Sequence, residues 1–225
     1  MRVMIGCLVR NRAWILPEYL KAIEAIEHDE KTIAFLENDS EDNTLDILEK
    51  SGHWILTTTT GYPNWRRGKY SENQYEHLAT MRNKFLNLFM ASEAEYLLSI
   101  DSDVIVPPDI LTRLLAEADG RTIIGAAISN VPGQEIDGNT PGNFMIRQDG
   151  RIVHPPTYPL SGTMTVDVIG AAYLIPRSAI LEGVRYGQHP QGEDIAFSQA
   201  AQEHGYQLKV ILDLVCDHRM MNEKG

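Results

Sequence analysis

Asp101 and Asp103 are the residues of this chain whose type and spacing point most directly to metal chemistry. They follow residues 96–100, an apolar run with the length of a buried strand, so they are expected where that strand leaves its sheet. A carboxylate buried without a partner is costly, so two together need hydrogen bonds, cations or a metal ion. Hard oxygen ligands at this spacing suit Mg²⁺ or Mn²⁺. In the alternative, structural interpretation, Asp101 caps a turn and Asp103 is solvated.

Further candidates for chemistry lie in the second half of the chain. Glu193 and Asp194 open a predicted helix, where the helix dipole favours carboxylates in any protein. Gly170 and Ala171 belong to a small-residue segment that a ligand can approach closely. His218 is a lone histidine, and lone histidines are usually structural or solvated. Each of these signals is weak by itself.

These residues need a scaffold, and the N-terminal part of the chain predicts a parallel sheet with covering helices. Strand-like and helical patterns alternate there, which is typical of that architecture. Ligands bind such sheets at the carboxyl ends of the strands. Arg10, Asp39 and Asp101 each follow a predicted strand, so we expect them at one edge. The predicted segments are a strand at 3–9, a helix from Pro17, a strand at 32–36, a helix at 45–50 and a strand at 54–58.

The rest of the chain predicts further elements interrupted by two irregular stretches. Residues 61–74 break every periodicity and predict a long surface loop. Its cations Arg66, Arg67 and Lys69 either meet phosphate or are solvated. Residues 129–162 are rich in Gly and Pro and resemble an insertion. The other predictions are a helix with Leu78, Met81, Phe85 and Leu88 on one face, strands at 96–100, 122–127, 144–146, 151–153, 166–176 and 208–212, and helices that begin near Asp109 and Gln191.

Length and composition limit what the site can belong to. The chain has 225 residues, of which 43% are hydrophobic, and a formal net charge of -11. These values allow one substantial globular core and, without a long basic run, argue against nucleic acid as a partner. Cys7 and Cys216 lie in apolar stretches and are expected to be reduced core thiols. No stretch resembles a signal peptide or a transmembrane segment, so we expect a cytoplasmic protein.

Several short motifs are informative together because of their order and spacing along the chain. They are Asn11, ENDSEDNT at 37–44, MRN at 81–83, DSD at 101–103, GEDIAF at 192–197 and His218. Together they make the chain resemble the nucleotide-sugar glycosyltransferases of the GT-A fold, closest to the family 2 type and also similar to the Anp1-type mannosyltransferases. The resemblance implies an α/β fold, a Rossmann-like three-layer α/β/α sandwich around a mostly parallel sheet. It also implies a single domain, with a nucleotide-sugar-binding half at 1–128 and an acceptor-binding half at 129–225.

The resemblance implies roles for residues on the donor side. Asp39 resembles the carboxylate that contacts the base or ribose, Asp101 the residue that holds ribose or metal-bound water, and Asp103 the direct metal ligand. His218 resembles a further ligand, so the implied metal site is Asp101, Asp103 and His218 with Mn²⁺ or Mg²⁺ as cofactor. The residues expected to bind the nucleotide sugar are Arg10, Asn11, Glu37, Asp39, Arg82, Asp101 and Ser102.

On the acceptor side, Glu193 and Asp194 resemble the acidic pair that faces the acceptor, and Asp194 would be the general base of an inverting enzyme. Gly170 and Ala171 would form the floor of the acceptor site. The implied partners are a nucleoside-diphosphate sugar and a saccharide or other hydroxyl acceptor. The implied activity is that of a hexosyltransferase, while the sugar, the acceptor and the stereochemistry stay open.

Two other functions compete with sugar transfer. A nucleotidyltransferase acting on a sugar phosphate also needs aspartates and a metal at strand ends, but it would carry a glycine-rich, lysine-bearing loop after its first strand, and residues 10–12 do not match one. A binding protein that holds a nucleotide sugar without transferring it would have the same fold. Retention of Asp103, Asp194 and His218 argues against the second alternative.

Overall fold

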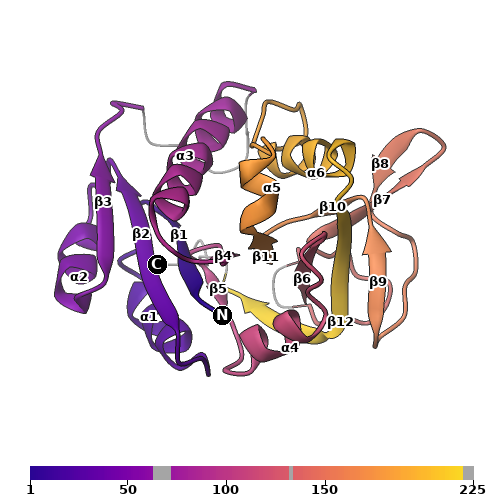
Figure 1. Cartoon of the computed structure of the whole chain (residues 1–225), viewed down its shortest axis with the longest axis horizontal. Coiled ribbons are helices and arrows are strands. Elements are labelled where there is room, and N and C mark those ends of the chain that lie inside the picture. The colour runs from indigo at the N-terminus through magenta and orange to yellow at the C-terminus, as the bar shows by residue number, and fades with distance from the viewer. Residues whose placement is uncertain (63–71, 132–133, 220–225) are drawn as a thin grey trace.

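The computed structural model describes residues 1–62, 72–131 and 134–219, and a large β-sheet forms its centre (Figure 1). Its strands cross the sheet in the order β3-β2-β1-β4-β11-β6-β12-β5, and β9 also pairs with β12. A small second sheet has the order β10-β7-β8. The strands are β1 (Val3–Val9), β2 (Lys31–Asn38), β3 (Trp54–Thr58), β4 (Tyr96–Ile100), β5 (Val104–Ile105), β6 (Thr122–Ile128), β7 (Phe144–Gln148), β8 (Arg151–Val153), β9 (Thr163–Val166), β10 (Val168–Ile169), β11 (Ala172–Pro176) and β12 (Gln207–His218).

Strand directions explain why the predicted site residues gather. β1 pairs in parallel with β2 on one side and with β4 on the other. The segments that follow these strands therefore leave the sheet at the same edge. β11 comes from the C-terminal half and runs antiparallel between β4 and β6, while β6 and β12 are parallel. The predicted mostly parallel sheet is confirmed, with β11 as an antiparallel insertion.

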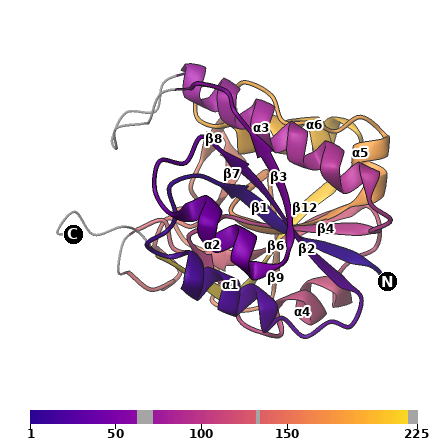
Figure 2. The same cartoon turned by 90° about the vertical axis from the view of Figure 1, so that its left-hand side faces the viewer.

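Helices cover both faces of the sheet and complete the predicted three layers (Figure 2). α1, α2 and α4 lie on one face, where Leu16, Ile23 and Leu48 are buried in one core cluster. α3, α5 and α6 lie on the other face, where Phe85 and Phe197 belong to a second cluster. The helices are α1 (Leu16–Glu24), α2 (Thr44–Ser51), α3 (Glu72–Ala91), α4 (Ile110–Ala116), α5 (Arg177–Leu181) and α6 (Glu193–Glu203).

The single strand predicted at 166–176 is wrong, because the segment divides into the end of β9, then β10, then β11. Asp167 interrupts it by accepting a hydrogen bond from the backbone N–H of Arg147 at 2.6 Å. Ala171 then adopts a left-handed conformation, with φ of 64°. Its carbonyl accepts the N–H of Asp101 at 2.7 Å, and this long-range contact holds a conformation that alanine seldom adopts. Apolar composition alone carried no sign of these breaks.

Other boundaries also differ from the sequence predictions. α3 begins at Glu72, so the predicted loop 61–74 ends earlier; most of that loop, with Arg66, Arg67 and Lys69, lies outside the described residues. The strand predicted at 208–212 continues to His218 through a register shift between Ile211 and Val215. This extension carries His218 beside β5, a strand that the sequence did not predict.

Two expectations from composition can be compared with the described structure. Cys7 and Cys216 are buried free thiols, which confirms the prediction of core cysteines. Burial raises the pKa of each thiol to about 12, so both are protonated and unreactive near neutral pH. Among the described residues, no helix combines the length and the apolar character that crossing a membrane requires.

Candidate active site

A cavity of about 230 Å³ lies at the edge of the sheet where β1, β2 and β4 end. The turn after β1 contributes Arg10, Asn11 and Arg12, and the turn after β4 contributes Ser102. Asn38 at the end of β2 and one side of α3 complete the wall. The structure thus brings together three of the residues predicted to bind the nucleotide sugar, Arg10, Asn11 and Ser102.

The arginines of this cavity have unused hydrogen-bonding capacity. Arg10 Nη2 donates to the carbonyl of Tyr62 at 2.7 Å, whereas Arg10 Nε and Nη1 are buried without a hydrogen-bond partner in the described part of the chain. Arg12 Nε is in the same situation. A buried donor left unpaired costs about 1–3 kcal/mol, and more when it is charged. Anionic oxygen atoms bound in the cavity would remove this cost.

The acidic turn after β2 has a different role from the cavity arginines. Glu37 is 5% exposed and accepts the backbone N–H of Ser40 at 2.9 Å. Ser40 in turn accepts the N–H of Asn11 at 3.1 Å, and Asn11 Oδ1 accepts the N–H of Glu41 at 2.7 Å. These bonds join the turn after β1 to the turn after β2. Glu37 therefore shapes the cavity and does not line it.

Asp39 is engaged by the segment that follows β3. Its carboxylate accepts the N–H of Thr60 at 3.0 and 3.1 Å, the N–H of Gly61 at 3.3 Å, and the hydroxyl of Thr60. These hydrogen bonds, with the Thr60 hydroxyl foremost, lower the pKa of Asp39 to about 2. A base or ribose would have to share or displace these bonds to reach the carboxylate.

Asp103 lies between an arginine and a histidine. Its Oδ2 accepts a hydrogen bond from Arg12 Nη2 at 3.1 Å, and its Oδ1 lies 3.6 Å from His218 Nε2. Burial raises the pKa of Asp103, but His218 and the guanidinium of Arg12 outweigh burial and lower the pKa overall. The same contact with Asp103 raises the pKa of His218. Asp103 and His218 therefore face each other, with Arg12 as an additional partner, and their role as metal ligands stays a prediction.

The fit of this site to a divalent cation rests on its donor atoms. Within residues 1–62, 72–131 and 134–219, no three His, Cys, Asp or Glu side chains are already gathered around one point. Asp103 and His218 nevertheless supply a carboxylate and an imidazole that face each other, and His218 Nδ1 is buried without a hydrogen-bond partner there. Carboxylate and imidazole ligands suit Mn²⁺ at least as well as Mg²⁺. The donor set fits such a cation, with Asp101 as the third predicted ligand.

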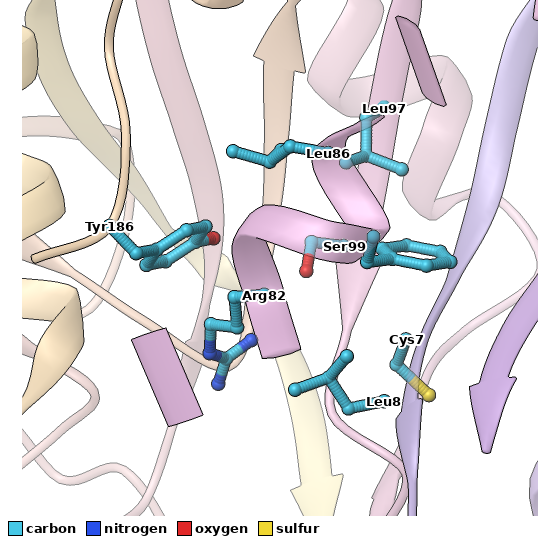
Figure 3. A pocket seen from close by; sticks show the side chains of 8 residues that line it. Cys7, Leu8, Arg82, Leu86, Leu97, Ser99 and Tyr186 are labelled. Atoms are coloured by element: carbon cyan, nitrogen blue, oxygen red, sulfur yellow. The ribbon is translucent and has the colours of Figure 1, made fainter. Parts of the chain in front are cut away.

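Arg82 joins Asp101 to the acidic pair at the start of α6. Its Nη2 donates to Asp101 Oδ1 at 3.0 Å, its Nε donates to Glu193 Oε1 at 2.9 Å, and Nε lies 4.0 Å from Asp194 Oδ1. Figure 3 shows Arg82 beside Tyr186, at a void of about 10 Å³ that holds at most one water molecule. The guanidinium lies 5.5 Å from the centre of the Tyr186 ring. One cation thus hydrogen-bonds Asp101 and Glu193, which are distant in the sequence, and lies close to Asp194.

Asp194 has the environment of a proton acceptor. Burial raises its pKa to about 7, with Glu193 and Asp101 adding to the increase and Arg82 opposing it. Its Oδ2 lies against Gly170, where an added Cβ would come within 2.7 Å of that oxygen. Gly170 therefore makes room for Asp194, and its role as the floor of the acceptor site stays a prediction. The Asp194 side chain is 27% exposed, so one part of it is open to solvent.

Several residues of the site were missed by sequence reasoning. Arg12, which binds Asp103, is not among the predicted site residues. Tyr173 donates a hydrogen bond to Asp194 at 3.2 Å, and Tyr186 contacts the Tyr173 hydroxyl. Asn143 donates to the carbonyls of Ala126 and Gly170 at 3.0 and 2.7 Å and so fixes the turn beside Asp194. Nothing in their local sequence distinguishes these residues from ordinary core or loop residues.

Comparison with known proteins finds a galactosyltransferase among the similar sequences. A search of curated sequences matched procollagen galactosyltransferase 1-A of Xenopus laevis, with 25% identity over 146 residues. The match covers 57% of this chain but only 23% of the relative, so the chain spans less than a quarter of that protein.

Solved structures show the same fold at low sequence identity. TarS 1-349 of S. aureus in complex with UDP-GlcNAc superposes with a TM-score of 0.64 and 16% identity, covering 99% of this chain and 60% of TarS. GalNAc-T7 with UDP, GalNAc and Mn²⁺ gives a TM-score of 0.71 at 14% identity, covering 99% and 44%. The mannosyltransferase PcManGT of Pyrobaculum calidifontis gives 0.61 at 15% identity, covering 100% and 58%. These likenesses show the GT-A fold.

The family assignment comes from a sequence model that covers more than half of the chain. The model of glycosyl transferase family 2 matches residues 7–158, a range that begins in β1 and includes the turn after β4 with Asp101 and Asp103. The fold, the strand-end site and this match agree, and the chain belongs to glycosyl transferase family 2.

Proposed function

We propose that this protein is a metal-dependent glycosyltransferase that moves a sugar from a nucleoside-diphosphate donor to an acceptor hydroxyl. The observation that carries the proposal is the position of Arg82, which hydrogen-bonds Asp101 on the donor side and Glu193 beside Asp194 on the acceptor side. A transfer reaction needs this proximity, because the leaving phosphate and the attacking hydroxyl both act on one sugar carbon. A protein that only binds a nucleotide sugar does not need its donor-side and acceptor-side carboxylates to be this close together.

On the donor side, the cavity arginines are the residues we assign to the diphosphate. Arg10 and Arg12 carry N–H groups that no described residue pairs with, and guanidinium groups bind phosphate oxygens strongly and with fixed geometry. Asp101, Asp103 and His218 would hold a divalent cation. When bound, that cation supplies Lewis-acid stabilisation of the charge on the leaving phosphate. The neighbours GalNAc-T7 and PcManGT, whose structures contain Mn²⁺ with UDP or GDP-Man, support this assignment.

On the acceptor side, Asp194 is assigned as the general base. A sugar hydroxyl is a poor nucleophile, and a carboxylate within hydrogen-bond reach assists it by accepting its proton. Burial raises the pKa of Asp194 to about 7, which brings the proton affinity of this carboxylate into the range useful at neutral pH. Glu193 and Asp101 are both hydrogen-bonded to Arg82. Asp194 is therefore the carboxylate of this group that we expect to accept the proton of the acceptor hydroxyl.

Nucleotidyl transfer is the less favoured function. The turn after β1 holds Arg10, Asn11 and Arg12, and Asn11 adopts a left-handed conformation with φ of 51°. Neither a run of glycines nor a lysine stands there to surround a triphosphate. The turn offers guanidinium groups, which suit a diphosphate.

Product analysis tests the proposal directly. The protein is incubated with Mn²⁺ and a panel of UDP- and GDP-sugars, with and without simple saccharide acceptors, and released nucleoside diphosphate and products are measured by mass spectrometry. We expect release from one donor in the wild type and at least a hundredfold lower turnover in Asp194→Asn, which keeps the shape but removes the base. Formation of a nucleotide sugar from a sugar phosphate and a nucleoside triphosphate would favour the other function. Near-normal turnover of Asp194→Asn would exclude Asp194 as the base.

A further inference from the structure

The two carboxylate oxygens of Asp194 have different surroundings. Oδ1 accepts a hydrogen bond from the hydroxyl of Tyr173 at 3.2 Å and lies 4.0 Å from Arg82 Nε. Oδ2 lies against Gly170, and no hydrogen bond to it occurs within the described residues. The side chain as a whole is 27% exposed. One oxygen is therefore held by the protein and the other is left for an incoming group.

The hydroxyl groups around Asp194 form a chain with a defined direction. An ionised carboxylate only accepts hydrogen bonds, so Tyr173 must donate its single proton to Asp194. The hydroxyl of Tyr186 contacts that of Tyr173 and must then act as its donor. Hydrogen bonds are therefore donated from Tyr186 to Tyr173 and from Tyr173 to Asp194.

The two tyrosines are held firmly enough to position a carboxylate. Tyr173 is fully buried in β11, and the ring of Tyr186 stacks on Phe197 with centroids 4.3 Å apart. The backbone of Tyr186 is fixed by Asn83, which accepts its N–H at 3.0 Å and donates to its carbonyl at 2.9 Å. The hydroxyl of Tyr173 therefore has little freedom to move away from Asp194.

We propose that Tyr173 is a positioning residue that holds Oδ1 of Asp194 and thereby reserves Oδ2 for the acceptor proton. This inference rests on the proposed glycosyl transfer. In that step the acceptor oxygen bonds to the anomeric carbon, the bond from that carbon to the phosphate oxygen breaks, and the nucleoside diphosphate leaves with the bonding electrons. The acceptor proton passes to Oδ2 of Asp194. Tyr173 keeps its own proton throughout.

The charged and titratable groups around Asp194 define what loss of the Tyr173 hydroxyl would change. Arg82 on α3 and the hydroxyl of Tyr173 on β11 lower the pKa of Asp194, while burial, Glu193 on α6 and Asp101 after β4 raise it. Tyr186, from the segment between α5 and α6, acts through Tyr173. Removing the Tyr173 hydroxyl therefore raises the pKa of Asp194 further, because a hydrogen bond to the charged form is lost.

The test compares Tyr173→Phe with Tyr158→Phe, which also removes a buried hydroxyl, one that donates to the Thr140 carbonyl away from Asp194. For Tyr173→Phe we expect kcat to fall about tenfold at pH 7, the acid limb of the kcat profile to move to higher pH, and the KM for the donor to stay within twofold. Tyr158→Phe should keep the wild-type kcat and pH profile even if its melting temperature falls.

Four results would contradict these proposals. An unmoved acid limb and near-normal kcat in folded Tyr173→Phe would overturn the role of Tyr173. Equal changes in both variants would assign the effect to general stability, which overturns it as well. Absence of transfer by the wild type would instead overturn the proposed function. Should Tyr173→Phe not fold, Tyr186→Phe removes the next donor in the chain and should move the limb in the same direction by a smaller amount; an unmoved limb there would overturn the proposal.

Discussion

At the scale of single residues, the site is organised by arginines that pair with carboxylates. Arg82 holds Glu193 and Asp101, and Arg12 holds Asp103. Partly buried carboxylates this close together would repel one another without such partners. The arginines therefore offset this repulsion and hold the acidic side chains in place before any ligand binds.

Arg12 should compete with the cation for Asp103. Its Nη2 lies 3.1 Å from Asp103 Oδ2, and the Arg12 side chain is 33% exposed. Because a partly exposed ion pair contributes at most about 1 kcal/mol, Arg12→Gln should tighten Mn²⁺ binding by up to about fivefold. Isothermal titration with Mn²⁺ alone measures this. Arg113→Gln, which breaks the remote pair with Asp213, is the control and should leave the affinity unchanged. Weaker Mn²⁺ binding by Arg12→Gln would contradict this competition.

Asp194 and Asp39 should affect stability with opposite dependence on pH. The folded-state pKa of Asp194 is raised from 3.8 to about 7, mainly by burial, so its contribution favours the folded state at low pH and is lost as pH rises through about 7. The pKa of Asp39 is lowered to about 2, mainly by the Thr60 hydroxyl, so its stabilisation is present above about pH 4 and is lost as pH falls towards 2.

Melting temperatures of Asp194→Asn and Asp39→Asn across pH check this pair. Relative to the wild type, Asp194→Asn should gain stability as pH rises from about 4 to about 8. Asp39→Asn should be less stable than the wild type at neutral pH, and its deficit should shrink as pH falls below about 4. Parallel curves for the two variants would show that the pKa shifts of Asp194 and Asp39 are not of opposite sign.

At the scale of elements, the turn between β10 and β11 connects the two sides of the site. The carbonyl of Ala171 accepts the N–H of Asp101, and Gly170 lies against Asp194. Asn143 fixes the turn by donating to the Gly170 carbonyl and by accepting the Gly170 N–H on its own carbonyl at 3.0 Å. A substitution that shifts this turn should therefore displace both Asp101 and Asp194.

Gly170→Ala should disable turnover without unfolding the protein. The new Cβ would lie 2.7 Å from Asp194 Oδ2, so the carboxylate must move, and a displacement of about 1 Å can lower kcat about a hundredfold. Donor affinity should change less than kcat, because the atoms nearest the new Cβ belong to Asp194 and Asn143, which do not line the cavity. Gly187→Ala, whose Cβ would meet Ala196 at an ordinary 3.4 Å, is the matched control. Normal kcat in Gly170→Ala would show that this turn does not position Asp194.

At the scale of the whole molecule, one sheet connects the proposed donor and acceptor sides. β11 carries Tyr173 and lies between β4, which leads to Asp101, and β6. The division of roles at residue 128 stays a prediction, but the sheet itself is continuous across it. A ligand on the donor side should therefore stabilise the acceptor side as well.

A thermal-shift screen tests this coupling with Mn²⁺ and individual nucleotide sugars. A donor at about 100 times its Kd adds roughly 2.7 kcal/mol, and each kcal/mol raises Tm by about 2–4 °C for a protein of this size. We expect one donor to raise Tm in a single transition, and Asp103→Ala to lose that shift. Two separate transitions, of which only one moves, would contradict the coupling between the sides.

The sequence by itself determined the alternation of strands and helices, the strand-end position of Arg10, Asp39 and Asp101, and the acidic pair that begins α6. These features depend on local periodicity and on residue type, and both can be read from a short segment without knowing its tertiary contacts. Only the tertiary structure decided which groups meet. Arg82 and Glu193 are 111 positions apart, and Arg12 and Asp103 are 91 apart. Their contacts depend on strand order and on the insertion of β11, so they exist only once the sheet has formed.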